Sequence, residues 1–104
     1  LLQERFKAAA DVPMRIAERC GQVVQLALPA ARLGNKWAVS DAGVGALLGK
    51  ASLRSALLNV EINLASINDA AYVAEAQRKM AELEAAAAET EAQVMEIVHK
   101  TIAG

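Results

Sequence analysis

The chain has 104 residues, of which 55% are hydrophobic and only 3% aromatic, so it is large enough for one modest domain whose core consists of small and aliphatic side chains. Eleven basic and twelve acidic residues give a formal net charge of -1, which excludes attraction of nucleic acid or anionic lipid by a strong overall field. The longest uncharged run, residues 21–31, is too short for a bilayer span of about 20 apolar residues, so we expect no membrane partner.

The N-terminal third of the chain predicts two helical segments. Residues 1–10 have the pattern of a helix that is ending, and Asp11 before Pro13 has the form of an N-cap followed by a first turn. The helix that follows is expected to be kinked or restarted at Pro29 and to end at residues 34–35. Its apolar face is predicted to comprise Ile16, Cys20, Val23 and Ala27.

A second helix is predicted from Asp41 to about Leu64, with Ser40 as its N-cap. Small and polar residues recur along it four and three apart, which places them on one stripe at about 100° per residue. The stripe consists of Gly45, Gly49, Ser52, Ala56, Asn59 and Asn63. Leucine, isoleucine and valine cover much of the remaining surface, so we expect an apolar side for the core. Either another helix backbone or a ligand approaches the small, polar side.

A third helix is expected after "SIND", where Ser66 followed by Asp69 resembles a capping box. No Gly or Pro interrupts the segment up to Ile102, so one helix of roughly 50 Å fits. Its seam of alternating three- and four-residue steps is Val73, Ala76, Met80, Leu83, Ala87, Thr90, Val94 and Ile97. No strand-like alternation is present, and the predicted fold class is therefore all-α, an oligomeric bundle of long helices.

Several chemically reactive side chains have simple interpretations. Cys20 is expected to be a small core residue, and a single cysteine excludes an internal disulfide and fits a reducing, cytoplasmic compartment. His99 is expected to be solvated near a helix end. The sequence has no His/Cys cluster with metal-ligand spacing, no Ser-His-Asp set and no phosphate loop. We expect no metal site.

An ordered set of short motifs resembles the cyclodeaminase/cyclohydrolase family, which includes methenyltetrahydrofolate cyclohydrolase and the cyclodeaminase domain of formiminotransferase-cyclodeaminase. The matching features are "AADVPMRIA", Gly34-Asn35, Ser40-Asp41, Asn59-Val60 and Ile62-Asn63-Leu64. The resemblance implies an all-α fold that works as a dimer or higher oligomer, with folate bound near a subunit interface. It also implies that residues 1–104 form a single helical unit, the C-terminal half of a larger domain. The start "LLQERF" lacks an initiator Met, and the glycine-rich segment typical of the family's N-terminal half does not occur.

The resemblance implies chemistry at the one-carbon unit between N5 and N10 of tetrahydrofolate. A cyclohydrolase opens the 5,10-methenyl ring with water to give 10-formyltetrahydrofolate, whereas a cyclodeaminase closes 5-formiminotetrahydrofolate and releases ammonia. The alternative from another class is a non-catalytic helical module for oligomerisation or folate binding. A tetrahydrofolate derivative is the expected substrate, and no metal or redox cofactor is expected.

Site residues follow from the same resemblance, and each also has a structural interpretation. Asp41 is the candidate catalytic carboxylate, or else it caps its helix and places a favourable negative charge near the positive helix end. The candidate substrate-binding residues are Asn35, Ser40, Gly45, Asn59 and Asn63, which would orient or admit the pterin and water. Lys50 and Arg54, one helical turn apart, either meet the glutamate tail of folate or form a solvated face.

Overall fold

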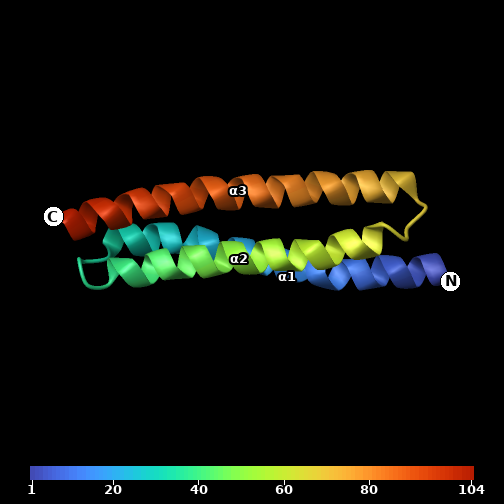
Figure 1. Cartoon of the computed structure of the whole chain (residues 1–104), viewed down its shortest axis with the longest axis horizontal. Coiled ribbons are helices and arrows are strands. Elements are labelled where there is room, and N and C mark those ends of the chain that lie inside the picture. The colour runs from blue at the N-terminus through green and yellow to red at the C-terminus, as the bar shows by residue number, and fades with distance from the viewer.

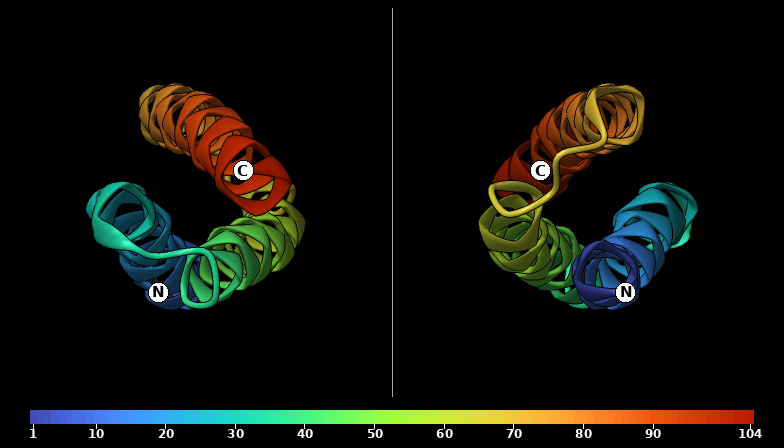
Figure 2. Two further views of the ribbon diagram at one scale, coloured as in Figure 1. Left: turned by 90° about the vertical axis from the view of Figure 1, so that its left-hand side faces the viewer. Right: turned by 90° about the vertical axis from the view of Figure 1, so that its right-hand side faces the viewer.

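A computed structural model describes residues 1–104 as three long helices in an up-down-up arrangement (Figure 1). The helices are α1 (Leu2–Leu33), α2 (Val39–Leu64) and α3 (Ala70–Ala103). The molecule is a rod with extents of 58 × 17 × 16 Å. Viewed end on, the helices lie on an arc with α2 between α1 and α3 (Figure 2). The prediction of an all-α bundle of long helices is confirmed.

α1 is one continuous helix through both of its prolines, which corrects the predicted break at Asp11. Instead of capping a new helix, the Asp11 carboxylate accepts hydrogen bonds from Arg15 at 3.1 and 2.6 Å. Pro13 has no N–H to donate to the Ala9 carbonyl one turn earlier. The Nδ2 amide of Asn63 in α2 donates to that carbonyl at 3.3 Å. The neighbouring helix thus supplies the hydrogen bond that the proline removes.

The buried face of α1 differs from the predicted one. Ile16 and Val23 are 50% and 49% exposed, and Cys20 is only half-buried. The buried residues are mainly small: Ala10, Pro13, Met14, Ala17, Gly21, Val24, Ala27 and Ala31. A face made mainly of alanine and glycine lets α1 lie close to α2, so small residues rather than Ile16 and Val23 mark the inner side of this helix.

α2 ends at Leu64, as predicted, but Ser40 does not cap its start. The helix begins at Val39, and no side chain of the N-cap residue Ala38 makes a capping hydrogen bond. The Oδ1 atom of Asn35 accepts from the N–H groups of Trp37 and Ala38, each at 2.9 Å. Asn35 therefore holds the turn between α1 and α2, a local structural role that was expected of Ser40.

The predicted small, polar stripe of α2 is divided between two environments. A Cβ atom at Gly49 would lie 2.9 Å from Cγ2 of Val24, so this glycine is needed for close contact with α1. Ala56 is also buried, whereas nothing lies within 4 Å of a Cβ atom at Gly45. Gly43, which is outside the stripe, packs against Val98 of α3. Helix packing thus explains Gly49 and leaves Gly45 without a packing reason.

α3 starts later than the capping-box pattern suggested. The carboxylate of Asp69, not the side chain of Ser66, caps the helix by accepting from the Tyr72 N–H at 3.1 Å. The predicted seam from Val73 to Ile97 is confirmed, because each of its eight residues is buried or half-buried. The core consists of two clusters, one around Leu53 and Leu57 and one towards the opposite end of the rod. None of the three helices has an apolar stretch long enough to traverse a bilayer.

Candidate functional site

The candidate catalytic residue Asp41 lies in the first turn of α2, and its side chain is exposed. Its backbone N–H donates to the Ala38 carbonyl at 3.1 Å, while no hydrogen bond or ion pair of its carboxylate is formed. The side chain therefore does not cap the helix, although it lies where the positive end of the helix dipole favours a negative charge. Ser40 is exposed beside it, and Gly45 lies one turn further along with open space in front of it.

Asn59 and Asn63, two of the three asparagines of the candidate site, lie near the other end of α2. Asn63 is half-buried, and its Nδ2 amide donates to the carbonyls of Ala9 and Asn59, at 3.3 and 2.9 Å. The 22 residues between Asp41 and Asn63 correspond to roughly 33 Å along the helix. One pterin ring cannot contact both residues within one chain, so the predicted site divides into two places.

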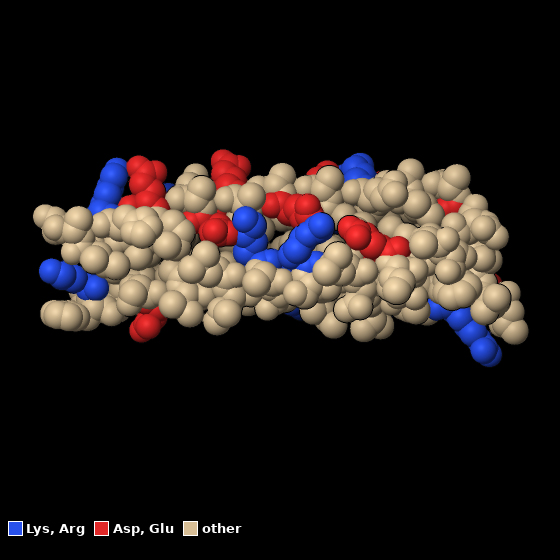
Figure 3. All heavy atoms as spheres, in the orientation of Figure 1, with Lys and Arg blue, Asp and Glu red and all other residues tan.

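Lys50 and Arg54 face α3 and form ion pairs with its carboxylates. The Nζ atom of Lys50 lies 3.1 Å from Glu91, and the Arg54 guanidinium lies 2.5 Å from Glu84 and 3.7 Å from Glu61. Basic side chains next to acidic ones are visible at the middle of the molecule in Figure 3. Nine residues at about 100° each place Lys50 on the opposite side of α2 from Asp41. A folate tail would have to reach the two cations from the α3 side and displace their carboxylate partners.

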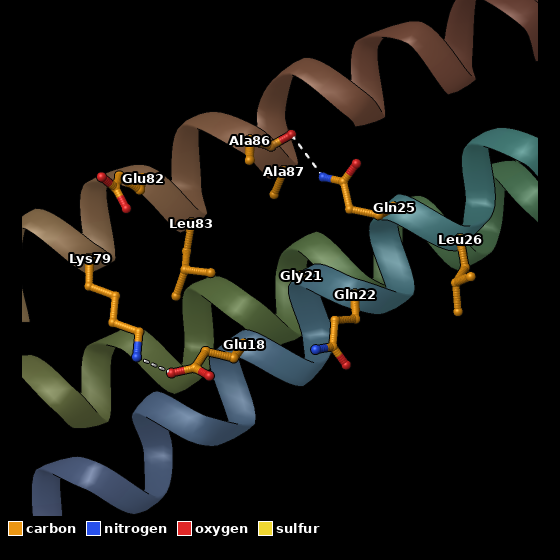
Figure 4. Close-up of a pocket in the computed structure, with 10 residues that line it drawn as sticks. All are labelled: Glu18, Gly21, Gln22, Gln25, Leu26, Lys79, Glu82, Leu83, Ala86 and Ala87. Atoms are coloured by element: carbon orange, nitrogen blue, oxygen red, sulfur yellow. Dashed lines mark hydrogen bonds and ion pairs between the residues drawn. The ribbon is translucent and has the colours of Figure 1, made fainter.

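A groove of about 820 Å³ lies between α1 and α3 (Figure 4). Gly21 and Ala87 form part of its apolar floor, and Leu83 points into it. The rim carries five polar residues: Glu18, Gln22, Gln25, Lys79 and Glu82. This volume is within the range of about 300–1,000 Å³ that is usual for small-molecule sites.

The polar groups of this groove bridge α1 and α3 at its two ends. The Lys79 ammonium lies 2.5 Å from the Glu18 carboxylate at one end (Figure 4). At the other end, Gln25 donates to the Ala86 carbonyl at 3.4 Å and accepts from the Thr90 hydroxyl at 2.8 Å. The groove thus combines an apolar floor with carboxylate, ammonium and amide groups at its ends, a combination that is usual in small-molecule sites.

Sequence reasoning did not select the residues of this groove. Glu18, Gln22 and Gln25 lie outside the predicted apolar face of α1, and their steps of four and three place them together on another face. That spacing was the available signal. Only the docking of α3 beside α1 turns this polar face into one wall of a cavity.

Surface ion pairs in α3 and at its N-cap lower the pKa values of three carboxyl groups. A hydrogen bond from Lys7, followed by one from the Tyr72 backbone, lowers the pKa of Asp69. Hydrogen bonds from Arg78 and Lys100 lower the pKa values of Glu75 and Glu96, respectively. No group of three or more His, Cys, Asp or Glu side chains lies close enough together to hold a metal ion.

Two comparisons with known proteins agree on the ancestry of the chain. A methenyltetrahydrofolate cyclohydrolase of Methylorubrum extorquens is 40% identical to it over 101 residues, which cover 97% of this chain and 47% of that protein. The chain thus spans about half the length of this curated relative. The family model described as formiminotransferase-cyclodeaminase matches residues 1–82, which include all of α1 and α2 and the first part of α3. The chain therefore belongs to the formiminotransferase-cyclodeaminase family.

Proposed function

We propose that this protein is a helical component of a folate one-carbon enzyme that hydrolyses 5,10-methenyltetrahydrofolate to 10-formyltetrahydrofolate. The observation that carries the proposal is the 40% identity to a methenyltetrahydrofolate cyclohydrolase across 97% of this chain. The family match also supports a second candidate, the formiminotetrahydrofolate cyclodeaminase reaction. We further propose a cytoplasmic homo-oligomer that takes a tetrahydrofolate derivative as substrate and needs no metal or redox cofactor.

The proposed reaction requires little covalent chemistry from the protein. The methenyl carbon of the substrate is electrophilic because it belongs to a cationic amidinium. Water adds to this carbon and loses one proton, which gives a neutral hydroxyl adduct. The hydroxyl of the adduct then gives up its proton as the formyl carbonyl forms, the bond from carbon to N5 breaks, and N5 takes up a proton, so that the formyl group stays on N10 and one proton is released overall. The protein must therefore hold the water in line with the carbon and accept its proton.

Asp41 is our candidate for the group that accepts this proton or stabilises the cation. Its carboxylate is exposed and engages no other side chain of the molecule. Ser40 and Gly45 lie within about a turn of it, and the open space at Gly45 would admit a ring close to the backbone. Asn59 and Asn63 are too far along α2 to act on the same ring, so any folate contact they make belongs to another part of the ligand or to another subunit.

The activity is tested by incubating the full-length protein with 5,10-methenyltetrahydrofolate and following the loss of its near-ultraviolet absorbance. We expect Asp41→Asn to lower kcat/KM by about a hundredfold or more, as loss of a general base does. Glu4→Gln is the matched control, since Glu4 is likewise an exposed acidic residue in the first turn of a helix. Its rate should equal that of the parent.

The outcomes separate the candidates. Absence of acceleration by the parent protein contradicts the cyclohydrolase function, and equal rates for the parent and Asp41→Asn remove Asp41 from the mechanism. Release of ammonia from 5-formiminotetrahydrofolate, without hydrolysis of the methenyl compound, would establish the cyclodeaminase instead. Inactivity in both assays would favour the non-catalytic folate-binding or oligomerisation module.

A further inference from the structure

The turn between α1 and α2, residues 34–38, connects two of the motifs singled out in the sequence, Gly34-Asn35 and Ser40-Asp41. This turn lies at one end of the rod, and the connection from α2 to α3 lies at the other (Figure 1). Asp41, the candidate proton acceptor, is the third residue of α2. Its carboxylate makes no hydrogen bond or ion pair within the chain, so the backbone at the start of α2 determines where it lies.

Asn35 binds the N–H groups that precede α2. Its Oδ1 atom accepts from Trp37 and Ala38, each at 2.9 Å, and its carbonyl accepts from Ala38 and Val39, at 3.1 and 2.8 Å. An N-cap asparagine likewise accepts from the N–H groups two and three residues later. The Ala38 carbonyl in turn accepts from the Asp41 N–H at 3.1 Å. A single residue, Ala38, thus links Asn35 to Asp41 by hydrogen bonds at its N–H and at its carbonyl.

The backbone on either side of Asp41 is packed against the other helices. A Cβ atom at Gly34 would lie 3.3 Å from the Cα atom of Val39, so the turn passes close to the start of α2. Val39 is fully buried in the core cluster at this end of the rod. Two residues after Asp41, a Cβ atom at Gly43 would lie 3.2 Å from Cγ2 of Val98 in α3. The segment therefore cannot move as a whole, and its remaining freedom is fraying of the first turn of α2.

The side chain of Asn35 has one group that the turn does not use. Both lone pairs of Oδ1 are engaged by backbone N–H groups, whereas the Nδ2 amide donates to no group of the chain. The direct substrate contact that the family resemblance implies for Asn35 would therefore have to use this amide. Serine is an equally good N-cap acceptor but lacks the amide. Replacing Asn35 by serine thus separates capping from direct substrate contact.

We propose that Asn35 is a positioning residue, which caps the turn before α2 and thereby holds the Asp41 carboxylate in place without contacting the substrate. A displacement of a reacting group by about 1 Å costs up to about a hundredfold in rate, so fraying of this one turn is enough to impair catalysis. The inference rests on the proposed function, because it assigns to Asn35 a role in the chemistry proposed for Asp41. The capping itself is measured without that chemistry.

The role in catalysis is tested with the full-length protein in the methenyltetrahydrofolate assay. Asn35→Ala should lower kcat by about tenfold and change KM by less than about twofold, since it affects the geometry of the reaction and not the binding of substrate. Asn35→Ser should restore kcat to within about twofold of the parent, because the serine hydroxyl replaces the capping acceptor. If Asn35→Ser instead shows a raised KM, Asn35 contacts the substrate and the positioning role is wrong.

Asp69→Ala is the matched control for a general loss of stability. Asp69 caps α3 at the opposite end of the rod by accepting from the Tyr72 N–H, and it also pairs with Lys7. Its removal should therefore destabilise the protein at least as much as Asn35→Ala does. We expect the kcat of Asp69→Ala to equal that of the parent. A loss as large as that of Asn35→Ala would show that stability, and not the position of Asp41, explains the effect.

Amide hydrogen exchange tests the capping independently of activity. Asn35→Ala should speed exchange of the Asp41 amide, which Asn35 does not itself contact, by about tenfold, whereas Asn35→Ser and Asp69→Ala should leave it unchanged. An unchanged Asp41 amide in Asn35→Ala, or an unchanged kcat in an active protein, would overturn the inference. A parent that is inactive, but whose Asp41 amide responds as expected, would contradict only the proposed enzyme function.

Discussion

The two sides of α2 are both apolar, but the chain uses only one of them for its own core. On the inner side, Leu53 and Leu57 are 1% and 0% exposed and pack against α1 and α3. On the outer side, Leu48 and Leu58 are 64% and 52% exposed. The two sides differ in how small residues are placed, because glycines on the inner side permit close contact with neighbouring helices. Apolar character alone therefore does not identify the inner side of a helix in this fold.

The glycines of α2 show the same contrast at single residues. Gly43 and Gly49 contact α3 and α1, respectively, and a Cβ atom at either would come within 3.2 Å of a neighbouring valine. Gly45 lies between them in the sequence and faces open space. A glycine in a helix interior is less favourable than alanine by about 1 kcal/mol. Packing offsets this cost at Gly43 and Gly49, while at Gly45 nothing within the chain does.

The largest expected effect comes from truncating one leucine on each side of α2. Leu57→Ala should lower the free energy of unfolding by about 2–5 kcal/mol, because it leaves a cavity in the core. Leu58→Ala should change the stability of the monomer by less than about 0.5 kcal/mol. Urea unfolding followed by circular dichroism measures both. The same experiment can be run at several protein concentrations. Leu58→Ala should then lower the free energy of unfolding only at concentrations at which the parent is a dimer. Equal losses for Leu57→Ala and Leu58→Ala at low concentration would contradict the division of α2 into two sides.

A smaller effect, of opposite sign at two positions, is expected from replacing glycine by alanine. Gly49→Ala should destabilise the fold by about 1–3 kcal/mol, because the added methyl overlaps Val24, which is fully buried and β-branched and so cannot rotate away. Gly45→Ala should stabilise the monomer by up to about 1 kcal/mol through helix propensity. Thermal unfolding of the two variants and the parent measures both changes in stability. A stabilised Gly49→Ala would show that α1 and α2 are less closely packed than described.

The smallest effect is expected at low pH, from the ion pair that joins the start of α3 to α1. The Asp69 carboxylate lies 2.8 Å from the Lys7 ammonium, and this hydrogen bond is the main reason that the pKa of Asp69 is below its ordinary value of 3.8. A folded-state pKa below the unfolded one stabilises the fold above the unfolded pKa, and this contribution is lost as the pH falls through the folded pKa.

Asp69→Asn isolates this contribution, because asparagine can still accept from the Tyr72 N–H but carries no charge for Lys7. We expect its unfolding free energy to fall less than that of the parent between about pH 5 and pH 2. Since the pair lies within one chain, the difference should not depend on protein concentration. If the unfolding free energy of Asp69→Asn falls as much as that of the parent on acidification, the acid-dependent loss belongs to Glu75 and Glu96, whose pKa values are also lowered.

Periodicity predicted the long elements well, because it depends only on which residues recur on one face. The α3 seam and the end of α2 at Leu64 were predicted for that reason. Local capping patterns were less informative. Asp11 before Pro13 has the form of a helix start, yet α1 continues through it. The carbonyl that Pro13 leaves free is bonded by Asn63, which is 54 residues away from Ala9, and no local pattern reports such a contact.

The candidate site was predictable only in part, for a similar reason. The resemblance in the sequence named Asp41, Asn63 and Lys50 together. All three lie on α2, but Asn63 is far from Asp41 along the helix and Lys50 points to the opposite side. Asn63 and Lys50 have partners in α1 and α3, whereas Asp41 has none. The groove between α1 and α3 was not anticipated, because its walls come from helices that are far apart in the chain.

The sequence by itself determined the all-α class, the helical segments of α2 and α3 and the family, since each depends on residue type and order along the chain. The tertiary structure alone decided which side of each helix faces inward, because that depends on where glycine and alanine let two backbones meet. It also decided that Lys50 and Arg54 pair with α3 and that Leu48 and Leu58 of α2 are exposed. These features arise from contacts between helices, and such contacts have no period in the sequence.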